Sequence, residues 1–147
     1  GKGVAGPNIA LPGCKNPSGL GYDARSGQLI SACANGKAAV VDARTHKLTH
    51  LLDIGAGPDA VIIDAARRLA FIPCGRDGTL SIIALDGPHG AHVIGAIKTA
   101  IGARTGALDP RTGALYLPTA RFGPPARPGA WPQLLPGSFH VLVVRPG

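Results

Sequence analysis

The chain has 147 residues, of which 45% are hydrophobic, so it is long enough for one folded domain and too apolar for an intrinsically disordered segment. Its 22 glycines and 14 prolines, with aspartate as the only acidic residue type, favour short strands and tight turns over helices. The formal charge of +7 permits binding to nucleic acid, anionic membranes or acidic ligands, and the lack of any apolar run of about 20 residues argues against a membrane span.

Three segments of the sequence repeat one another in chain order. The first begins at Pro17 with "PSGLGYDARSGQLISACANGKAAVVDA", and the second begins at Pro58 with "PDAVIIDAARRLAFIPCGRDGTLSIIA". The third begins at Arg104 with "RTGALDPRTGALYLPTA" and resumes at "GSFHVLVV". Equivalent positions are Asp23, Asp64 and Asp109 at one turn, Cys33, Cys74 and Thr119 at the end of one strand, and Gly36, Gly78 and Gly137 at a second turn.

Each repeat is predicted to form four strands. In the first repeat these are residues 19–23, 29–34, 37–43 and 48–54, and Asn35-Gly36 between the second and third strands is a strong hairpin signal. The second repeat uses residues 76–78 for the same hairpin. Because the equivalent aspartates are 41 and 45 residues apart, the period and the strand number are typical of a β-propeller blade.

The predicted fold is therefore all-β, a partial β-propeller of about three four-stranded blades in a single domain. Residues 1–16 are expected to hold the outer strand of a preceding blade, and the blades themselves are expected at residues 17–57, 58–102 and 103–147. A proline-rich insertion, residues 121–136, interrupts the third repeat between its second and third strands. It is predicted to be an enlarged turn of that blade rather than a linker or a disordered tail.

Five motifs follow one another along the chain: "GCKNPSGLGYD", "SACANGKAAVVDARTHKL", "DIGAGPDAVIID", "AFIPCGRDGTLSII" and "GARTGALDPRTGALYLPTARFG". The residues of these motifs and the order of the motifs resemble the later blades of YncE-like proteins, which belong to the YVTN group of β-propeller repeats. The resemblance covers nearly the whole chain from about Pro12 onward. It implies an exported bacterial protein, periplasmic or secreted, whose relatives are closed rings of typically seven blades and more than twice this length.

Three blades cannot close such a ring. The first and last blades are therefore expected to expose apolar faces, which mark interaction surfaces. We expect the chain to pair with a second copy, or with another protein, through these open blade edges. Because the sequence has no initiator methionine and no signal peptide, Gly1 is expected to begin a processed chain or a fragment.

One face of the predicted propeller gathers most of the candidate binding residues. Strands alternate in direction within a blade, so the connections between blades share a face with the turns between second and third strands, including the insertion. Candidates for binding a protein partner or an anionic ligand there are Asp59, Arg76, Arg104, Arg121, Phe122, Arg127 and Trp131. Arginine suits carboxylate or phosphate through two parallel hydrogen bonds. The alternative is that Arg104 and Asp59 pair between blades while the other arginines are solvated.

The three cysteines permit one disulfide at most. Cys14 precedes the first strand and Cys33 ends the second, so a bond between them is the candidate disulfide if the protein is exported. Cys74 repeats the position of Cys33 and is predicted to be a free, buried thiol. The loop histidines His89 and His92 have no evident third ligand, so no metal site is predicted.

No catalytic motif is evident, since a P-loop, H-E-x-x-H and G-x-S-x-G are all missing, and no cofactor is predicted. The favoured interpretation is a non-enzymatic scaffold or binding module for a protein partner or an anionic ligand. One alternative is a subunit or fragment of a redox or cofactor-associated propeller enzyme. A second is single-stranded nucleic-acid binding, for which Phe122 and Trp131 would form a small stacking platform, although the aromatic content is only 4%.

Overall fold

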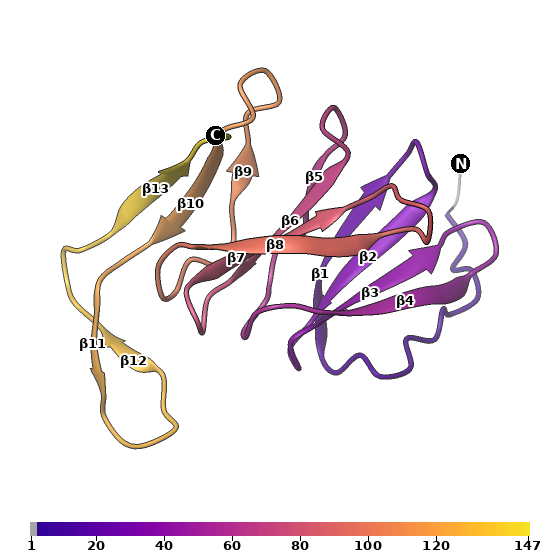
Figure 1. Ribbon diagram of the computed structural model, residues 1–147. Coiled ribbons are helices and arrows are strands. Elements are labelled where there is room, and N and C mark those ends of the chain that lie inside the picture. Colours follow the sequence, from indigo (N-terminus) through magenta and orange to yellow (C-terminus); the bar gives the residue numbers. More distant parts are fainter. Residues whose placement is uncertain (1–2) are drawn as a thin grey trace.

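The computed structural model describes residues 3–147, which form thirteen strands and contain no helix long and apolar enough to cross a membrane (Figure 1). The first sheet contains, in spatial order, β1 (Pro17–Asp23), β2 (Gln28–Cys33), β3 (Lys37–Asp42) and β4 (Lys47–Asp53). The second contains β5 (Ile62–Asp64), β6 (Leu69–Cys74), β7 (Thr79–Ala84) and β8 (His92–Lys98). Both are antiparallel meanders, and they lie beside each other as two blades.

The third sheet has three strands, in the order β13 (His140–Val144), β10 (Leu115–Thr119) and β9 (Ala107–Leu108). The repeat predicts four strands for this blade, and the sheet has three. β10 and β13 pair directly, from Leu115 opposite Val144 to Thr119 opposite His140. The insertion between them is therefore an enlarged turn within one blade, as the repeat predicts.

The insertion, residues 121–136, forms a hairpin that we call the arm. Its strands are β11 (Phe122–Pro125) and β12 (Pro132–Leu134), and Figure 1 shows it projecting from one end of the third sheet. Proline has no N–H to donate to a central sheet ladder, but a two-stranded hairpin leaves one side of each strand without a partner. The prolines are tolerated here for that reason.

Residues 3–16 form no strand, and Gly1 and Lys2 lie outside the described residues. The expected outer strand of a preceding blade is therefore not found in this segment. An outer strand needs the edge of a neighbouring sheet, and the described residues contain no sheet before β1. Instead, the segment runs along the outward side of the first sheet, where Ile9 and Leu11 line a small apolar cavity together with Leu29 and Val41.

The end of this segment is fixed to the first blade at the turn between β2 and β3. The side chain of Asn35 accepts a hydrogen bond from Lys15 N at 3.1 Å and donates one to Gly13 O at 3.0 Å. A disulfide joins Cys14 to Cys33 at the same place, with the two Cα atoms 5.3 Å apart. Cys74, at the position equivalent to Cys33, is a buried free cysteine.

The main apolar core lies between the first two blades. Large side chains from β2, β3 and β6 interlock there with alanines, so that the two sheets approach closely. Its buried members are Ile30, Ala32, Ala38, Val40, Ala70, Ile72, Cys74, Ile83, Leu85 and Ala91. This packing gives both blades an apolar run in their inner strands, as expected for strands covered on both faces.

An aspartate organises the turn between the first and second strands of every blade. Its carboxylate accepts backbone hydrogen bonds, from Ser26 N to Asp23 at 3.1 Å, from Arg67 N to Asp64 at 3.0 Å and from Arg111 N to Asp109 at 2.9 Å. The fourth residue after each aspartate has a left-handed backbone: Gly27 at φ 69°, Arg68 at φ 60° and Gly113 at φ 74°. Arg68 is the only one of these three residues that is not glycine. The left-handed conformation costs a residue with a side chain about 1–2 kcal/mol.

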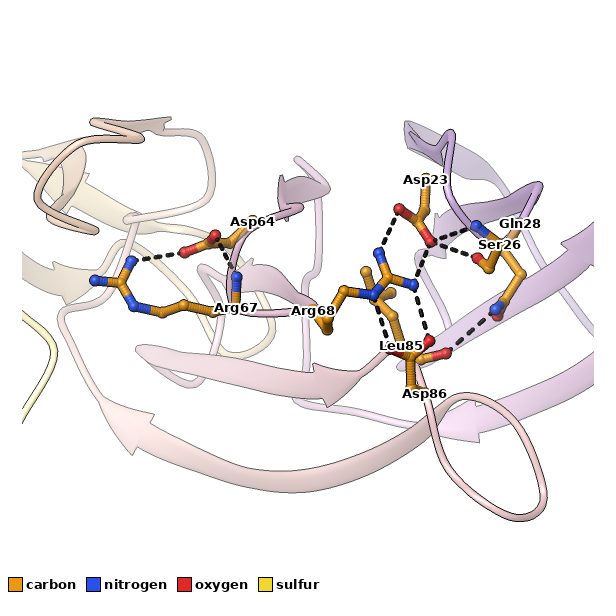
Figure 2. A network of polar contacts seen from close by, with 8 residues as sticks. All are labelled: Asp23, Ser26, Gln28, Asp64, Arg67, Arg68, Leu85 and Asp86. Atoms are coloured by element: carbon orange, nitrogen blue, oxygen red, sulfur yellow. Dashed lines mark hydrogen bonds and ion pairs between the residues drawn. The ribbon is translucent and has the colours of Figure 1, made fainter.

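Arg68 joins the first two blades through two carboxylates (Figure 2). Its Nη1 and Nη2 donate to the two oxygens of Asp23, both at 2.7 Å, and its Nε and Nη2 donate to Asp86 at 2.7 and 2.8 Å. The guanidinium holds the pKa of the Asp23 carboxyl, which is 1% exposed, well below its usual range. Hydrogen bonds to Asp86 and Asp23 raise the pKa of Arg68 in turn. These bonds offset the strain of the left-handed backbone.

Arg67 extends the same connection to the third blade. Its Nη1 donates to Asp64 at 2.8 Å, and its Nη2 donates to the carbonyl oxygen of Thr112 at 3.1 Å. Burial raises the pKa of the Asp64 carboxyl, but the hydrogen bonds from Arg67 outweigh it, so the pKa is lowered. Two adjacent arginines thus tie the second blade to both of its neighbours.

Replacing Arg68 with glycine isolates the contribution of the ion pair, because glycine keeps the left-handed backbone that Gly27 and Gly113 have in the other blades. We expect Arg68→Gly to lower the free energy of unfolding by about 3 kcal/mol at pH 7, since it leaves the carboxylate of Asp23 buried without a cationic partner. Urea denaturation measures this change. Arg111→Ala, which removes an exposed arginine 3.7 Å from Asp109, is the control and should cause no measurable loss.

The same variant has a pH signature. Because the pKa of Asp23 is lowered in the folded protein, its ion pair stabilises the fold fully above the unfolded pKa of about 3.9, and this contribution is lost as the pH falls below that value. The stability gap between the parent protein and Arg68→Gly should therefore narrow between pH 5 and pH 3, both about one unit from the unfolded pKa. A gap that stays constant over this range would contradict the assigned role of Asp23.

Candidate functional site

The end of the blades opposite to Arg68 carries the turns between second and third strands and the connections between blades. Asp59, Arg76, Arg104 and Trp131 line one open cleft there, with a volume of about 660 Å³, which we call the basic cleft. The rest of its lining comes mainly from the first blade and its connection to the second: Asn16, Ser18, Ala34, Asn35, Gly36, Asp53, Ile54, Ala56, Gly57 and Pro58. Residues distant in the sequence thus share one surface.

Arg76 and Trp131 form the closest contact between the arm and the second blade. The Cζ atom of Arg76 lies 5.1 Å from the centroid of the Trp131 ring, within the range of a cation–π interaction. Within residues 3–147, Arg76 has no carboxylate oxygen closer than the 4.0 Å of an ion pair. Its charge is therefore paired with the face of an aromatic ring, which leaves its N–H groups available to a ligand.

Asp59 lies where the three blades meet. Its carbonyl oxygen accepts a hydrogen bond from Gly19 N of the first blade at 2.9 Å, and its carboxylate lies 3.6 Å from Arg104 Nε of the third. Ala60 N also donates to the carbonyl oxygen of Arg104 at 3.0 Å. The alternative expectation of an ion pair between Arg104 and Asp59 is thus observed. The pair is loose, however, since the side chain of Arg104 is 58% exposed.

A second cleft, of about 430 Å³, adjoins the basic cleft, and we call it the apolar cleft. Arg104 and Trp131 line both clefts and form the wall between them. The other residues of the apolar cleft are mostly apolar: Gly102, Thr105, Pro118, Thr119, Ala120, Phe122, Pro132, Leu134 and Phe139. Several are strongly exposed, Phe139 to 73% and Leu134 to 43%. This surface lies directly beside two arginine side chains.

The arm is held at its base by hydrogen bonds to the third blade. Arg121 N donates to Ser138 Oγ at 3.0 Å, and Ser138 N donates to Leu135 O at 3.3 Å. Within the arm, Leu135 N donates to Arg121 O at 2.9 Å. Ser138 is buried, so its hydroxyl group is fixed in place. The position of Trp131 is therefore set by the blade rather than by the arm alone.

Two of the seven candidate residues lie apart from the two clefts. Arg121 lines a separate hollow at the base of the arm together with Phe122, Leu135 and His140. Arg127 is exposed in the loop at the tip of the arm, where its carbonyl oxygen accepts a hydrogen bond from Ala130 N at 3.1 Å. The repeat predicts that both residues lie in the connection between the second and third strands of the third blade. The direction in which each side chain faces depends on the fold of the arm.

Two apolar residues of the site, Leu134 and Phe139, were not predicted from the sequence. Each lies within eight residues of Trp131, in the same insertion or shortly after it, a grouping of apolar residues that could have indicated the cleft.

Of the other candidates, burial raises the pKa of the Cys74 thiol, which makes it a poor nucleophile. In residues 3–147, no group of three histidine, cysteine or acidic side chains is gathered to hold a metal ion.

Comparison with solved structures shows the fold. The chain is similar to hydrazine synthase from Kuenenia stuttgartiensis over 80% of its own length, with 15% sequence identity and a TM-score of 0.64. It is also similar to the Cps50 (Swd1) β-propeller domain of Myceliophteria thermophila over 69% of its length, with 16% identity and a TM-score of 0.49. The chain spans 33% and 37% of those two chains. No family model and no curated protein matches the sequence.

The chain has the fold of an open β-propeller. The sheets succeed one another around a common direction as blades, and the described residues do not close into a ring. The basic cleft therefore lies on the face of the propeller that carries the blade connections, and the arm of the third blade reaches the second blade across that face.

Gly102 supports the arm, and its replacement tests this support. It has φ 82°, and a Cβ atom at this position would lie 2.4 Å from Phe122 Cε2. We expect Gly102→Ala to lower the free energy of unfolding by about 1–3 kcal/mol more than Gly27→Ala, because the Phe122 ring must move. Gly27 is a matched control, since it has φ 69° and open space around a Cβ atom.

Trp131 is the single tryptophan of the chain, so its fluorescence reports the position of the arm. Displacement of Phe122, at the base of the arm, should shift the emission maximum in Gly102→Ala and leave it unchanged in Gly27→Ala. Equal stability losses and identical emission spectra in the two variants would show that Gly102 does not position the arm.

Proposed function

We propose that the chain is a binding module whose basic cleft engages an anionic group of a protein partner or ligand. The observation that carries this proposal is the Arg76 side chain, held over Trp131 at 5.1 Å without a carboxylate partner among the described residues. A second guanidinium, that of Arg104, lines the same cleft and is only loosely paired. Two arginines at one open cleft favour a carboxylate or phosphate, which accepts their parallel N–H donors.

The surroundings of these arginines support the same proposal. Asp59 pairs with Arg104 at 3.6 Å, a distance at which a ligand carboxylate with better geometry competes readily. Asp77, next to Arg76 in the sequence, directs one carboxylate oxygen to Ala56 N at 2.8 Å and the other to Thr79 at 2.7 Å. Its charge is thus committed to the backbone turn. The charge of +7 over the chain also favours acidic partners.

Trp131 fluorescence measures binding without a label. Titration with a short peptide of aspartates should change the emission in a saturable and salt-sensitive way. We expect Arg76→Gln and Arg104→Gln each to weaken the affinity about tenfold, the size of one charge-assisted hydrogen bond. Arg25→Gln and Arg111→Gln remove exposed arginines from the other end of the blades and should leave the affinity unchanged.

The result separates the proposal from general attraction to a basic protein. If all four variants weaken binding equally, the cleft has no special role. If single-stranded oligonucleotides bind tightly while acidic peptides do not, the nucleic-acid alternative gains the support that the peptide proposal loses. Oligonucleotide affinity would then depend steeply on salt concentration.

We also infer that a second copy of the chain covers the open blade faces. On the outward side of the third blade, Tyr116 lies opposite Val143 and Pro118 opposite Val141, and all four are exposed. Leu20 on the outward side of the first blade is exposed to 64%. A second copy presents both kinds of apolar face, so head-to-tail contacts would cover them and extend the propeller toward the ring that the resemblance to YncE-like proteins implies.

Light scattering tests this assembly. The protein is expected to have twice the mass of one chain, and Val143→Lys should reduce the mass to that of a single chain by placing a charge in the contact. Ile94→Lys, on the outer strand β8 of the middle blade, is the matched control and should leave the mass unchanged. A parent protein that is monomeric at high concentration would contradict the inference.

A further inference from the structure

The two clefts share a wall, and this arrangement restricts the kind of ligand that fills both. Arg104 and Trp131 line the basic cleft on one side and the apolar cleft on the other. A ligand that lies across this wall meets two guanidinium groups and, directly beside them, the side chains of Phe122, Leu134 and Phe139. Neither a purely charged ligand nor a purely apolar one contacts the whole surface.

We propose that the site binds an extended segment of a partner protein in which a large apolar residue, aromatic or aliphatic, adjoins acidic residues. The apolar side chain would occupy the apolar cleft, and the carboxylates would contact Arg76 and Arg104. This inference rests on the proposed anion-binding function and adds the class of partner. Charge complementarity selects acidic residues, and the exposed apolar lining selects their neighbour.

The exposure of the apolar lining favours a ligand that covers it. Phe139 is 73% exposed, Trp131 44% and Leu134 43%, although the arm that carries two of them is fixed at its base by Arg121 N and Ser138. Apolar side chains held in an exposed and fixed arrangement are ready to bury surface without losing much conformational freedom. Tryptophan and arginine are also the residue types that contribute most to protein interfaces.

The shape of the site favours a peptide segment over a compact small molecule. The two clefts have volumes of about 430 and 660 Å³, both are open to solvent, and they meet at Trp131. An extended chain places successive side chains about 3.3 Å apart along its length and on alternate sides. Neighbouring residues of such a chain can therefore enter the two clefts when its backbone runs along the wall that separates them.

Three blocked peptides test the inference through the fluorescence of Trp131. The first contains two aspartates followed by a phenylalanine, the second replaces the phenylalanine with alanine, and the third replaces the aspartates with asparagines. We expect the first peptide to bind about tenfold more tightly than either of the others, since each half of the site contributes at least one such factor. None of the peptides contains tryptophan, so the signal comes from the protein alone.

Variants of the protein assign each half of the ligand to its cleft. Leu134→Asn and Phe139→Ser should remove the advantage of the phenylalanine peptide over the alanine peptide and leave the affinity for the alanine peptide unchanged. Arg76→Gln should weaken binding of both aspartate peptides. Ile94→Ser changes an exposed apolar residue on β8, away from both clefts, and should change neither affinity.

The outcomes distinguish a failure of the inference about the partner from a failure of the proposed anion-binding function. If the alanine and phenylalanine peptides bind equally well and both depend on Arg76, the inference about the partner is overturned while the proposed anion-binding function stands. If the asparagine peptide binds as tightly as the aspartate peptide with phenylalanine, the coupling of charge and apolar contact is also overturned. If neither aspartate peptide binds, the proposed function itself fails. A small phenylalkyl carboxylate that binds as tightly as the peptide would overturn the assignment to a protein segment.

Discussion

The arrangement of the blades depends on one arginine in an unfavourable backbone conformation. Arg68 occupies a left-handed position at φ 60°, where the other two blades have glycine. The conformation directs its guanidinium to Asp23 of the first blade and Asp86 of its own, with four hydrogen bonds of 2.7–2.8 Å. A lysine could neutralise the charges but could not form this double fork. Two of these four bonds run to the first blade, so the departure from glycine at this position of the repeat supplies a contact between blades.

The arginine side chains at the two ends of the blades are paired differently. At one end, Arg67 and Arg68 have their donors committed to Asp64, Thr112, Asp23 and Asp86. At the other end, Arg76 faces an aromatic ring and Arg104 is loosely paired. Arginines at both ends contribute equally to the net charge of +7, but Arg67 and Arg68 direct their N–H groups to carboxylates, whereas Arg76 has no carboxylate partner among the described residues. Net charge alone could not separate these two groups.

The sequence predicted the blades well because their signals are local. Asp23, Asp64 and Asp109 each close a turn with backbone N–H groups two or three residues away, and their spacing therefore marks the register of every blade. The same register placed the insertion between β10 and β13. Contacts between blades have no such local signal. The bond from Arg68 to Asp23 spans 45 residues, and the contact of Trp131 with Arg76 depends on the path of the arm. The path of residues 3–16 along the first sheet likewise has no signal in the repeat.

The arm changes what an open propeller face can recognise. A short hairpin such as Asn35-Gly36 presents backbone groups and little apolar surface, whereas the arm carries Trp131 and Leu134 beyond the edge of its own blade. Trp131 then acts in two ways at once, since its face holds the Arg76 guanidinium and its ring forms the wall of the apolar cleft. A ligand that displaces or reinforces the cation–π contact therefore alters the shape of the neighbouring cleft. In the proposed binding mode, charge recognition and apolar recognition are coupled through a single side chain, so the affinity for a ligand that satisfies both should exceed what the separate contacts provide.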